Sequence, residues 1–289
     1  MREDSIELPG GRFSLLRAGT GSRLAIVLHG FPDHPPTFAA LIDALAAGGY
    51  SVAAPWLRGY APSTLDGPFH VERLAADVLE LATALGHERF ALVGHDWGAV
   101  TTYTTCALAP ERVLAAVTMA VPHPLAFLRN AARTAQLARS WYMLFFQLPG
   151  AAALARAGDH ALIDFLWRRW SPGLRLDDDA RAALHAALDA SGDAPIGYYR
   201  AILRPPREAL ARMSAKAPTA QPIITPTLNL QGADDGCVAP SVARGQERFF
   251  RGPFAAEVLP GVGHFLQLEA PDQVAAHTLG WLRAHAPSA

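Results

Sequence analysis

Cysteine is scarce in this sequence of 289 residues, which holds only two, Cys106 and Cys237. Two cysteines are too few for a disulfide framework, so we expect both to be reduced and the protein to work in the cytoplasm. Long apolar runs are missing as well, and none approaches the ~20 residues of a membrane-spanning helix. Because residues 1–5 are polar, no signal peptide is expected either.

Net charge is also close to zero, at −1, with 25 basic and 26 acidic side chains. This balance gives no electrostatic reason to expect a nucleic acid or an anionic membrane as a partner. Apolar residues make up 51% of the chain, which is enough for a substantial core. The length fits one large α/β domain or two small ones.

Strand and helix signals alternate over the first 123 residues. The expected strands are residues 13–18, 24–28, 50–54, 90–93 and 113–121, and the expected helices are 37–47, 70–85 and 99–108. Alternation of this kind is typical of a doubly wound, mostly parallel sheet, so the expected fold class is α/β.

Between about 124 and 220 the signals are helical only. Strands return at 227–230 and 255–259, with helices expected at 241–250 and 271–285. We therefore expect a core made of residues 1–123 and 221–289, and a helical cap, or lid, made of residues 124–220.

The pentapeptide Gly-His-Asp-Trp-Gly at residues 94–98 follows an apolar run and precedes a helix-compatible stretch. This is the strand, sharp turn and helix of a nucleophile elbow, in which Gly94 and Gly98 allow close backbone approach. The central residue of such elbows is usually serine, but here it is Asp96. A carboxylate is already ionised near pH 7, so it can attack an sp3 carbon without a general base and form an alkyl ester. The alternative is that Asp96 only caps the helix.

An acid and a histidine follow Asp96 in the order that this architecture requires. Asp234 and Asp235 come after one expected strand, and His264 lies in a Gly-rich loop after the last one. Both loops fall at the carboxyl edge of the sheet, where such folds place their sites, and His264 oriented by an acid can activate water. Asp235 is the third residue after Gly232, which is the usual place of the acid in the family that these motifs resemble, and Asp234 is the alternative. The remaining histidines show no compact set of metal ligands.

A fourth motif, His-Gly-Phe-Pro at residues 29–32, directly follows the strand expected at 24–28. A turn that contains glycine can direct a backbone N–H into the site at this point. We expect the N–H groups of Phe31 and Trp97 to form an oxyanion hole, since Trp97 follows the nucleophile. The Phe31–Pro32 bond is one that can be cis.

Together these motifs resemble those of the epoxide hydrolases of the α/β-hydrolase fold, over nearly the whole chain. The resemblance implies that the cap is inserted after the sixth strand. Residues 140–150 and 197–200 resemble the segments that carry the family's ring-opening tyrosines, which assigns these roles to Tyr142 and Tyr199, with Tyr198 as the alternative to Tyr199. Phenols suit this task, because a pKa near 10 keeps them protonated and able to protonate the departing oxygen. The chain departs from the family at Trp56, where Asp is usual; Trp56 either alters the rim of the site or merely packs.

The resemblance implies an enzyme that needs no metal and no organic cofactor and converts a small apolar epoxide and water into a vicinal diol. A haloalkane dehalogenase with the same Asp nucleophile is the main alternative, although a halide leaving group would leave the paired tyrosines unexplained. A non-catalytic receptor on the same fold is a third possibility, and retention of all three catalytic residue types argues against it. Neither nucleic acid nor a membrane is expected as a partner, and a homodimer remains open.

Overall fold

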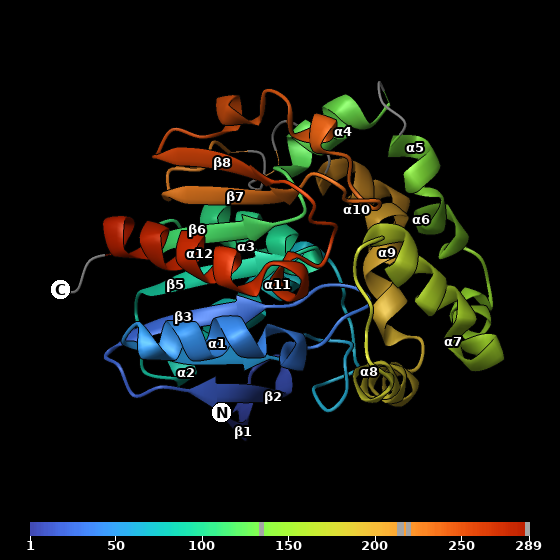
Figure 1. Cartoon of the computed structure of the whole chain (residues 1–289), viewed down its shortest axis with the longest axis horizontal. Helices are drawn as coiled ribbons and strands as arrows, with labels where there is room; N and C mark the ends of the chain where they lie inside the picture. Colours follow the sequence, from blue (N-terminus) through green and yellow to red (C-terminus); the bar gives the residue numbers. More distant parts are fainter. Residues whose placement is uncertain (133–135, 213–216, 218–220, 287–289) are drawn as a thin grey trace.

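The computed structural model describes residues 1–132, 136–212, 217 and 221–286 of the chain. Its centre is one eight-stranded sheet with the order β1-β2-β4-β3-β5-β6-β7-β8, covered by helices on both faces (Figure 1). The strands are β1 (Arg2–Leu8), β2 (Gly11–Ala18), β3 (Arg23–Leu28), β4 (Tyr50–Pro55), β5 (Phe90–His95), β6 (Val113–Met119), β7 (Thr227–Gly232) and β8 (Phe254–Leu259).

The sheet is parallel from β4 to β8 in its strand order, and only β1 and β2 pair antiparallel with their neighbours. Strands β4 and β5 are buried along their whole length, which fits parallel strands covered on both faces. The predicted α/β class with a doubly wound, mostly parallel sheet is therefore confirmed. Strand β1 was not predicted, because it is a charged edge strand in which only Leu8 is buried.

The helices that cover the sheet are α1 (Ala39–Ala47) and α12 (Pro271–His285) on one face and α2 (Val71–Ala84) and α3 (Trp97–Leu108) on the other (Figure 1). A short α11 (Leu266–Glu269) precedes α12. The helix predicted over residues 241–250 is wrong. Two 3-10 turns, Pro240–Ala243 and Gln246–Phe249, stand there instead, because Gly245 between them has a φ of 75° that a continuous helix cannot accommodate.

Helices fill the segment between β6 and β7, and they gather at one end of the sheet (right side of Figure 1). They are α4 (Pro124–Ala131), α5 (Gln136–Arg139), α6 (Trp141–Phe145), α7 (Ala151–Trp170), α8 (Asp178–Ser191), α9 (Gly197–Leu203) and α10 (Pro206–Arg212). Residues 133–135, 213–216 and 218–220 of the predicted cap lie outside the described residues, and the division into core and cap stays a prediction. Within the described ranges, no helix combines the length and apolar character needed to cross a membrane.

The strand order places a crevice between β3 and β5. From β3 the chain adds β4 on one side, whereas β5 and the later strands lie on the other, so the loops after β3 and β5 diverge. Ligands of open α/β sheets bind at such a switch point, outside the carboxyl ends of the strands. Phe31 follows β3 and Asp96 follows β5, while Asp235 and His264 follow β7 and β8. The topology therefore brings these four residues to one edge of the sheet.

Candidate active site

Asp96 occupies the turn between β5 and α3, with a φ of 52° and a ψ of −116°. A positive φ is strained for a residue with a side chain, so the surrounding backbone must hold it. Its glycine neighbours are needed for steric reasons. A Cβ on Gly94 would lie 2.2 Å from the Gly98 carbonyl oxygen, and one on Gly98 would lie 2.4 Å from the Leu28 carbonyl oxygen. The strand, turn and helix predicted around Asp96 are therefore present, with the close backbone approach that the two glycines allow.

His264 lies between the two carboxylates. Its Nδ1 is 2.9 Å from Oδ2 of Asp235, and its Nε2 is 3.6 Å from Oδ2 of Asp96. The first distance is a hydrogen bond and the second is too long for one. All three side chains are buried, whereas Asp234, the alternative acid, is exposed. The structure thus brings Asp96, Asp235 and His264 together and leaves Asp234 outside the group.

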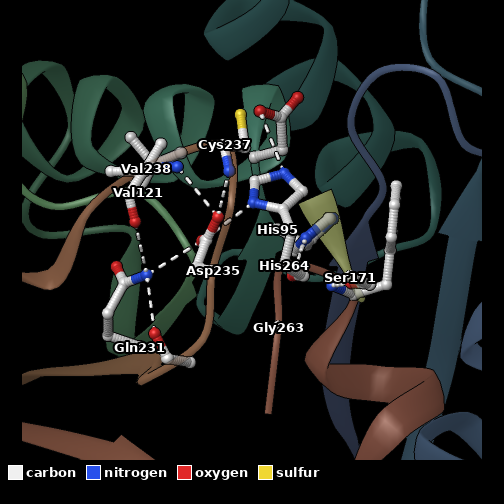
Figure 2. Close-up of polar contacts among 12 residues, drawn as sticks. His95, Val121, Ser171, Gln231, Asp235, Cys237, Val238, Gly263 and His264 are labelled. Atoms are coloured by element: carbon white, nitrogen blue, oxygen red, sulfur yellow. Dashed lines mark hydrogen bonds and ion pairs between the residues drawn. The ribbon is translucent and has the colours of Figure 1, made fainter. Parts of the chain in front are cut away.

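Asp235 is held on both of its oxygens (Figure 2). Its Oδ1 accepts hydrogen bonds from the backbone N–H groups of Cys237, at 2.7 Å, and Val238, at 2.8 Å. Its Oδ2 accepts one from Nε2 of Gln231 at 2.9 Å, in addition to the contact with His264. A carboxylate with this many donors is fixed in position and orients the imidazole.

The charges of the three groups depend on one another. Burial alone lowers the pKa of His264, but the charge and hydrogen bond of Asp235, followed by the nearby carboxylate of Asp96, outweigh it and raise that pKa to about 10. Burial likewise raises the pKa of Asp96, yet His264, His95 and the Phe31 N–H reverse the effect and leave it below its usual value. At neutral pH the resting site is therefore a buried imidazolium facing ionised Asp96.

The backbone N–H of Phe31 donates a hydrogen bond of 2.8 Å to Oδ1 of Asp96. Trp97 is the first residue of α3, so its N–H is one of the amides that have no acceptor within the helix. Both donors predicted for the oxyanion hole thus lie at the carboxylate or at the helix end beside it. The Phe31–Pro32 peptide bond is cis.

Two tyrosines approach the carboxylate from the helical segment, Tyr142 from α6 and Tyr199 from α9. Their ring centroids are 5.6 Å apart and nearly perpendicular, and the Tyr199 ring also lies 5.2 Å from that of Trp97. Burial raises the pKa of both phenols well above 10, so both stay protonated. The hydroxyl of Tyr198 points elsewhere, since it donates to the backbone carbonyl of Arg58. This geometry favours Tyr199 over Tyr198 as the second ring-opening residue.

A cavity of about 260 Å³ joins these groups, and its lining includes Asp96, Trp97, Tyr142 and Tyr199. The rest of its wall is mostly apolar, with Phe69, Val100, Leu125, Phe127, Met143 and Ile202 among the lining residues. Trp56 is buried and lies outside this lining, so at this departure from the family the indole packs in the core.

Sequence reasoning missed two residues that touch the site. Cys237 places its Sγ 3.3 Å from the Tyr142 hydroxyl, in addition to its backbone bond to Asp235. Its position two residues after Asp235, in the same loop, could have indicated that it lies at the site. His95, inside the elbow motif, has its Nε2 2.9 Å from the backbone carbonyl of His264 and so fixes the loop that carries the histidine.

The other histidines were expected to form no compact set of metal ligands, and that expectation stays a prediction, although two of them do lie together. His160 in α7 and His185 in α8 come together with Asp159, and one ligand atom from each lies within 4.8 Å of the others. A second such set consists of Asp235, Cys237 and His264. Spacing along the chain could not reveal the first set, because its two histidines lie on different helices.

Comparison with known proteins covers the sheet and the helical segment alike. The family model of the alpha/beta hydrolase fold matches residues 26–271. Epoxide hydrolase A of Mycobacterium tuberculosis is 31% identical over 97% of this chain and 97% of its own length. Epoxide hydrolase 3 of Xenopus tropicalis is 30% identical over 92% of this chain and 73% of its own. The crystal structure of epoxide hydrolase A from Mycobacterium thermoresistibile matches with a TM-score of 0.83 and 26% identity over 98% of both chains.

Proposed function

Because this chain belongs to the epoxide hydrolases of the α/β-hydrolase fold, we propose that it converts an epoxide into a vicinal diol through a covalent ester on Asp96. The observation that carries the proposal is that the two oxygens of Asp96 make different contacts. Oδ1 accepts the N–H of Phe31 at 2.8 Å, whereas Oδ2 faces His264 at 3.6 Å without a hydrogen bond. One oxygen is therefore held and the other is free to attack.

In the first step, Oδ2 of Asp96 attacks an epoxide carbon and the bond from that carbon to the ring oxygen breaks. Tyr142 and Tyr199 hydrogen-bond the departing oxygen, and one phenol gives it a proton. Both phenols are weak acids in this buried site, so they donate only as the negative charge on the oxygen develops. The product of this step is a hydroxyalkyl ester of Asp96.

Ester formation removes the negative charge that Asp96 holds against His264. The pKa of His264 then falls, because Asp96 is one of the groups that raise it. The imidazolium loses its proton through water to the phenolate and becomes the neutral base that the second step needs. The reaction itself thus converts His264 from the partner of a nucleophile into a general base.

In the second step, His264, oriented by Asp235, takes a proton from water, and the hydroxide attacks the ester carbonyl of Asp96. The charge that develops on Oδ1 is stabilised by the N–H groups of Phe31 and Trp97. The bond from the carbonyl carbon to the alkyl oxygen breaks, and the proton of the added hydroxyl passes to that oxygen. The diol leaves, and the site returns to an ionised Asp96 beside the imidazolium.

Isotope labelling tests this cycle directly. During multiple turnovers of styrene oxide in ¹⁸O-labelled water, the Asp96 carboxylate should take up label, because water attacks its carbonyl carbon. Mass spectrometry of the peptide that contains Asp96 measures the uptake, and the peptide that contains Asp234 is the internal control. Labelled diol with unlabelled Asp96 would mean direct attack of water on the epoxide and would refute the ester.

The tyrosines provide a second test. Replacing Tyr142 or Tyr199 with phenylalanine should lower kcat/KM for styrene oxide by about 10² or more, the usual contribution of a positioned general acid. Tyr198→Phe is the matched control, because the Tyr198 hydroxyl is bonded to the Arg58 carbonyl, and its kcat/KM should stay near that of the wild type. An equal loss in Tyr198→Phe and Tyr199→Phe would contradict the assignment.

The cavity indicates the kind of substrate. At about 260 Å³ with mostly apolar walls, it suits an epoxide that carries one aromatic ring or an aliphatic group of similar size. We also propose that residues 124–220 act as a cap over the carboxylate, because Tyr142 and Tyr199 come from this segment. The free cysteines Cys106 and Cys237 support a place in the reducing cytoplasm.

A further inference from the structure

We propose that Ser171 and Glu269 are positioning residues for the catalytic base, because they fix the backbone of the loop that carries His264. The inference rests on the proposed function, in which His264 takes a proton from water in the second step. Ser171 directly follows the last residue of α7 and lies beside His264 (Figure 2), and Glu269 is the last residue of α11. Neither residue lines the cavity beside Asp96, so an effect on the reaction would pass through His264.

The loop that carries His264 needs support from outside itself. Residues 260–265, between β8 and α11, form no helix or strand, so their N–H groups need other acceptors. The imidazole must also stay between Asp235, at 2.9 Å, and Asp96, at 3.6 Å, to activate water. A displacement of about 1 Å in such a site can lower the rate by about 10²-fold, so whatever holds this loop also sets the activity.

The two side chains bind the N–H groups on either side of His264. The N–H of Gly263 donates to Oε2 of Glu269 at 3.0 Å, and the N–H of Phe265 donates to Oγ of Ser171 at 3.0 Å. The Ser171 hydroxyl in turn donates to Oε1 of Glu269 at 2.5 Å. Hydrogen bonds to an ionised carboxylate are the strong ones, and these three bonds close a ring around the backbone of the base.

The amide of His264 itself binds the end of α7. It donates to the carbonyl of Trp170 at 3.1 Å, and the N–H of Gly236, the residue after Asp235, donates to the same carbonyl at 2.9 Å. A carbonyl in the last turn of a helix has no donor within the helix, so it is available to both loops. One helix end therefore holds the loop of the acid and the loop of the base together.

The close approach of α7 accounts for two glycines next to the catalytic residues. A Cβ on Gly236 would lie 1.9 Å from the carbonyl oxygen of Arg169. One on Gly263 would lie 2.6 Å from Cα and 2.8 Å from Oγ of Ser171. Both distances are shorter than real atoms allow, so the helix end and the two loops approach as closely as their backbones permit.

Burial makes the hydroxyl of Ser171 hard to replace. Ser171 is 0% exposed, so in Ser171→Ala the N–H of Phe265 would lose its acceptor in a place that bulk water does not reach. An unsatisfied buried N–H is costly, and the loop should shift to find another acceptor. Because His264 is the preceding residue, the imidazole should move with it.

The displacement should slow only the second step. Ester formation uses Asp96 and the two tyrosines, whereas ester hydrolysis uses the imidazole as its base. When hydrolysis slows and the ester accumulates, KM falls together with kcat. Loss of folded protein would instead lower kcat and leave KM unchanged, so the two effects can be told apart.

The test measures the two steps separately in Ser171→Ala and Glu269→Gln. With enzyme in excess over styrene oxide, loss of the epoxide gives the rate of ester formation, and intact mass after an acid quench gives the rate of ester hydrolysis. Hydrolysis should slow by about 10-fold, the scale for residues that orient a functional histidine through hydrogen bonds. Ester formation should stay within about twofold of the wild-type rate, which also reports that the variants are folded.

Ser191→Ala is the matched control. Ser191 is also buried, and its Oγ accepts from the N–H of Ala61 at 2.9 Å and donates to the carbonyl of Ala187, far from the loop of His264. Both of its rates should equal those of the wild type. Hydrolysis at the wild-type rate in Ser171→Ala and Glu269→Gln, or equal slowing of both steps, would overturn the inference. Turnover with no ester in any of these proteins would overturn the proposed function, and this inference with it.

Discussion

Replacing Asp96 with alanine is expected to lower diol formation from styrene oxide by at least about 10⁴-fold, the scale of loss when a member of a catalytic triad is removed. The reason is chemical, because alanine offers no atom that can form the ester. The phenols, His264 and the oxyanion donors remain, so the residual rate reports what positioning alone achieves. Initial rates of diol formation over a range of substrate concentrations measure the effect on kcat/KM.

Asp234→Asn is the matched control for the Asp96 variant. It also removes one carboxylate at this edge of the sheet, but Asp234 is exposed and lies outside the buried group. Its rate should remain close to that of the wild type, whereas Asp235→Asn should lose most of its activity because the imidazole loses its orienting partner. An Asp96→Ala enzyme that keeps more than a hundredth of the wild-type rate, with a Tm close to that of the wild type, would show that water attacks the epoxide directly.

The sequence predicted the parts of this site that a local pattern defines. The elbow is recognisable because the strained φ of Asp96 requires small neighbours at fixed positions, and Gly94 and Gly98 occupy them. Asp235 and His264 could be placed because each follows a strand, and parallel strands end at one edge. Both statements depend only on residues close together in the chain and on the topology of the sheet.

Contacts between distant segments could not be predicted in this way. The bond between Cys237 and Tyr142 joins the loop after β7 to a helix of the inserted segment. No sequence pattern in either segment indicates that the two are in contact. The stacked His160 and His185 depend on how α7 bends at residues 158–160, a bend without a proline to mark it. Strand β1 was not predicted for a different reason. An exposed edge strand has no buried apolar face, so its sequence lacks the alternation of apolar and polar residues that marks a strand.

Replacing His264 with glutamine should stop the cycle after its first step. Glutamine cannot take a proton from water, so the ester on Asp96 should accumulate and each chain should consume one equivalent of epoxide. Multiple-turnover diol formation should fall by about 10⁴-fold or more. The mass of the intact protein should increase by the mass of the epoxide, because ring opening adds the whole molecule to the carboxylate.

The rate of ester formation in the His264→Gln variant should depend on pH, and the charges of the site give the direction of this dependence. Burial raises the pKa of Asp96, and His264 is the main group that opposes this effect. Without the imidazolium, the pKa of Asp96 should rise, so the variant should form the ester more slowly at low pH and recover as the pH increases. Trapping rates measured across this range should therefore follow the ionisation of Asp96, and the wild type should show no such dependence until lower pH.

The site of attachment decides what the mass increase means. Epoxides also alkylate thiols, and Cys237 lies close enough to the site to compete, although burial raises its pKa well above the usual value and keeps it protonated. Hydroxylamine cleaves an ester but leaves a thioether intact, so if Asp96 carries the adduct, the reagent should release the diol and leave the hydroxamate of Asp96 in place of the epoxide-derived mass. The double variant Asp96→Ala, His264→Gln should gain no mass. An adduct that resists hydroxylamine and maps to Cys237, or a His264→Gln enzyme that continues to turn over, would mean that Asp96 and His264 do not have the roles proposed for them.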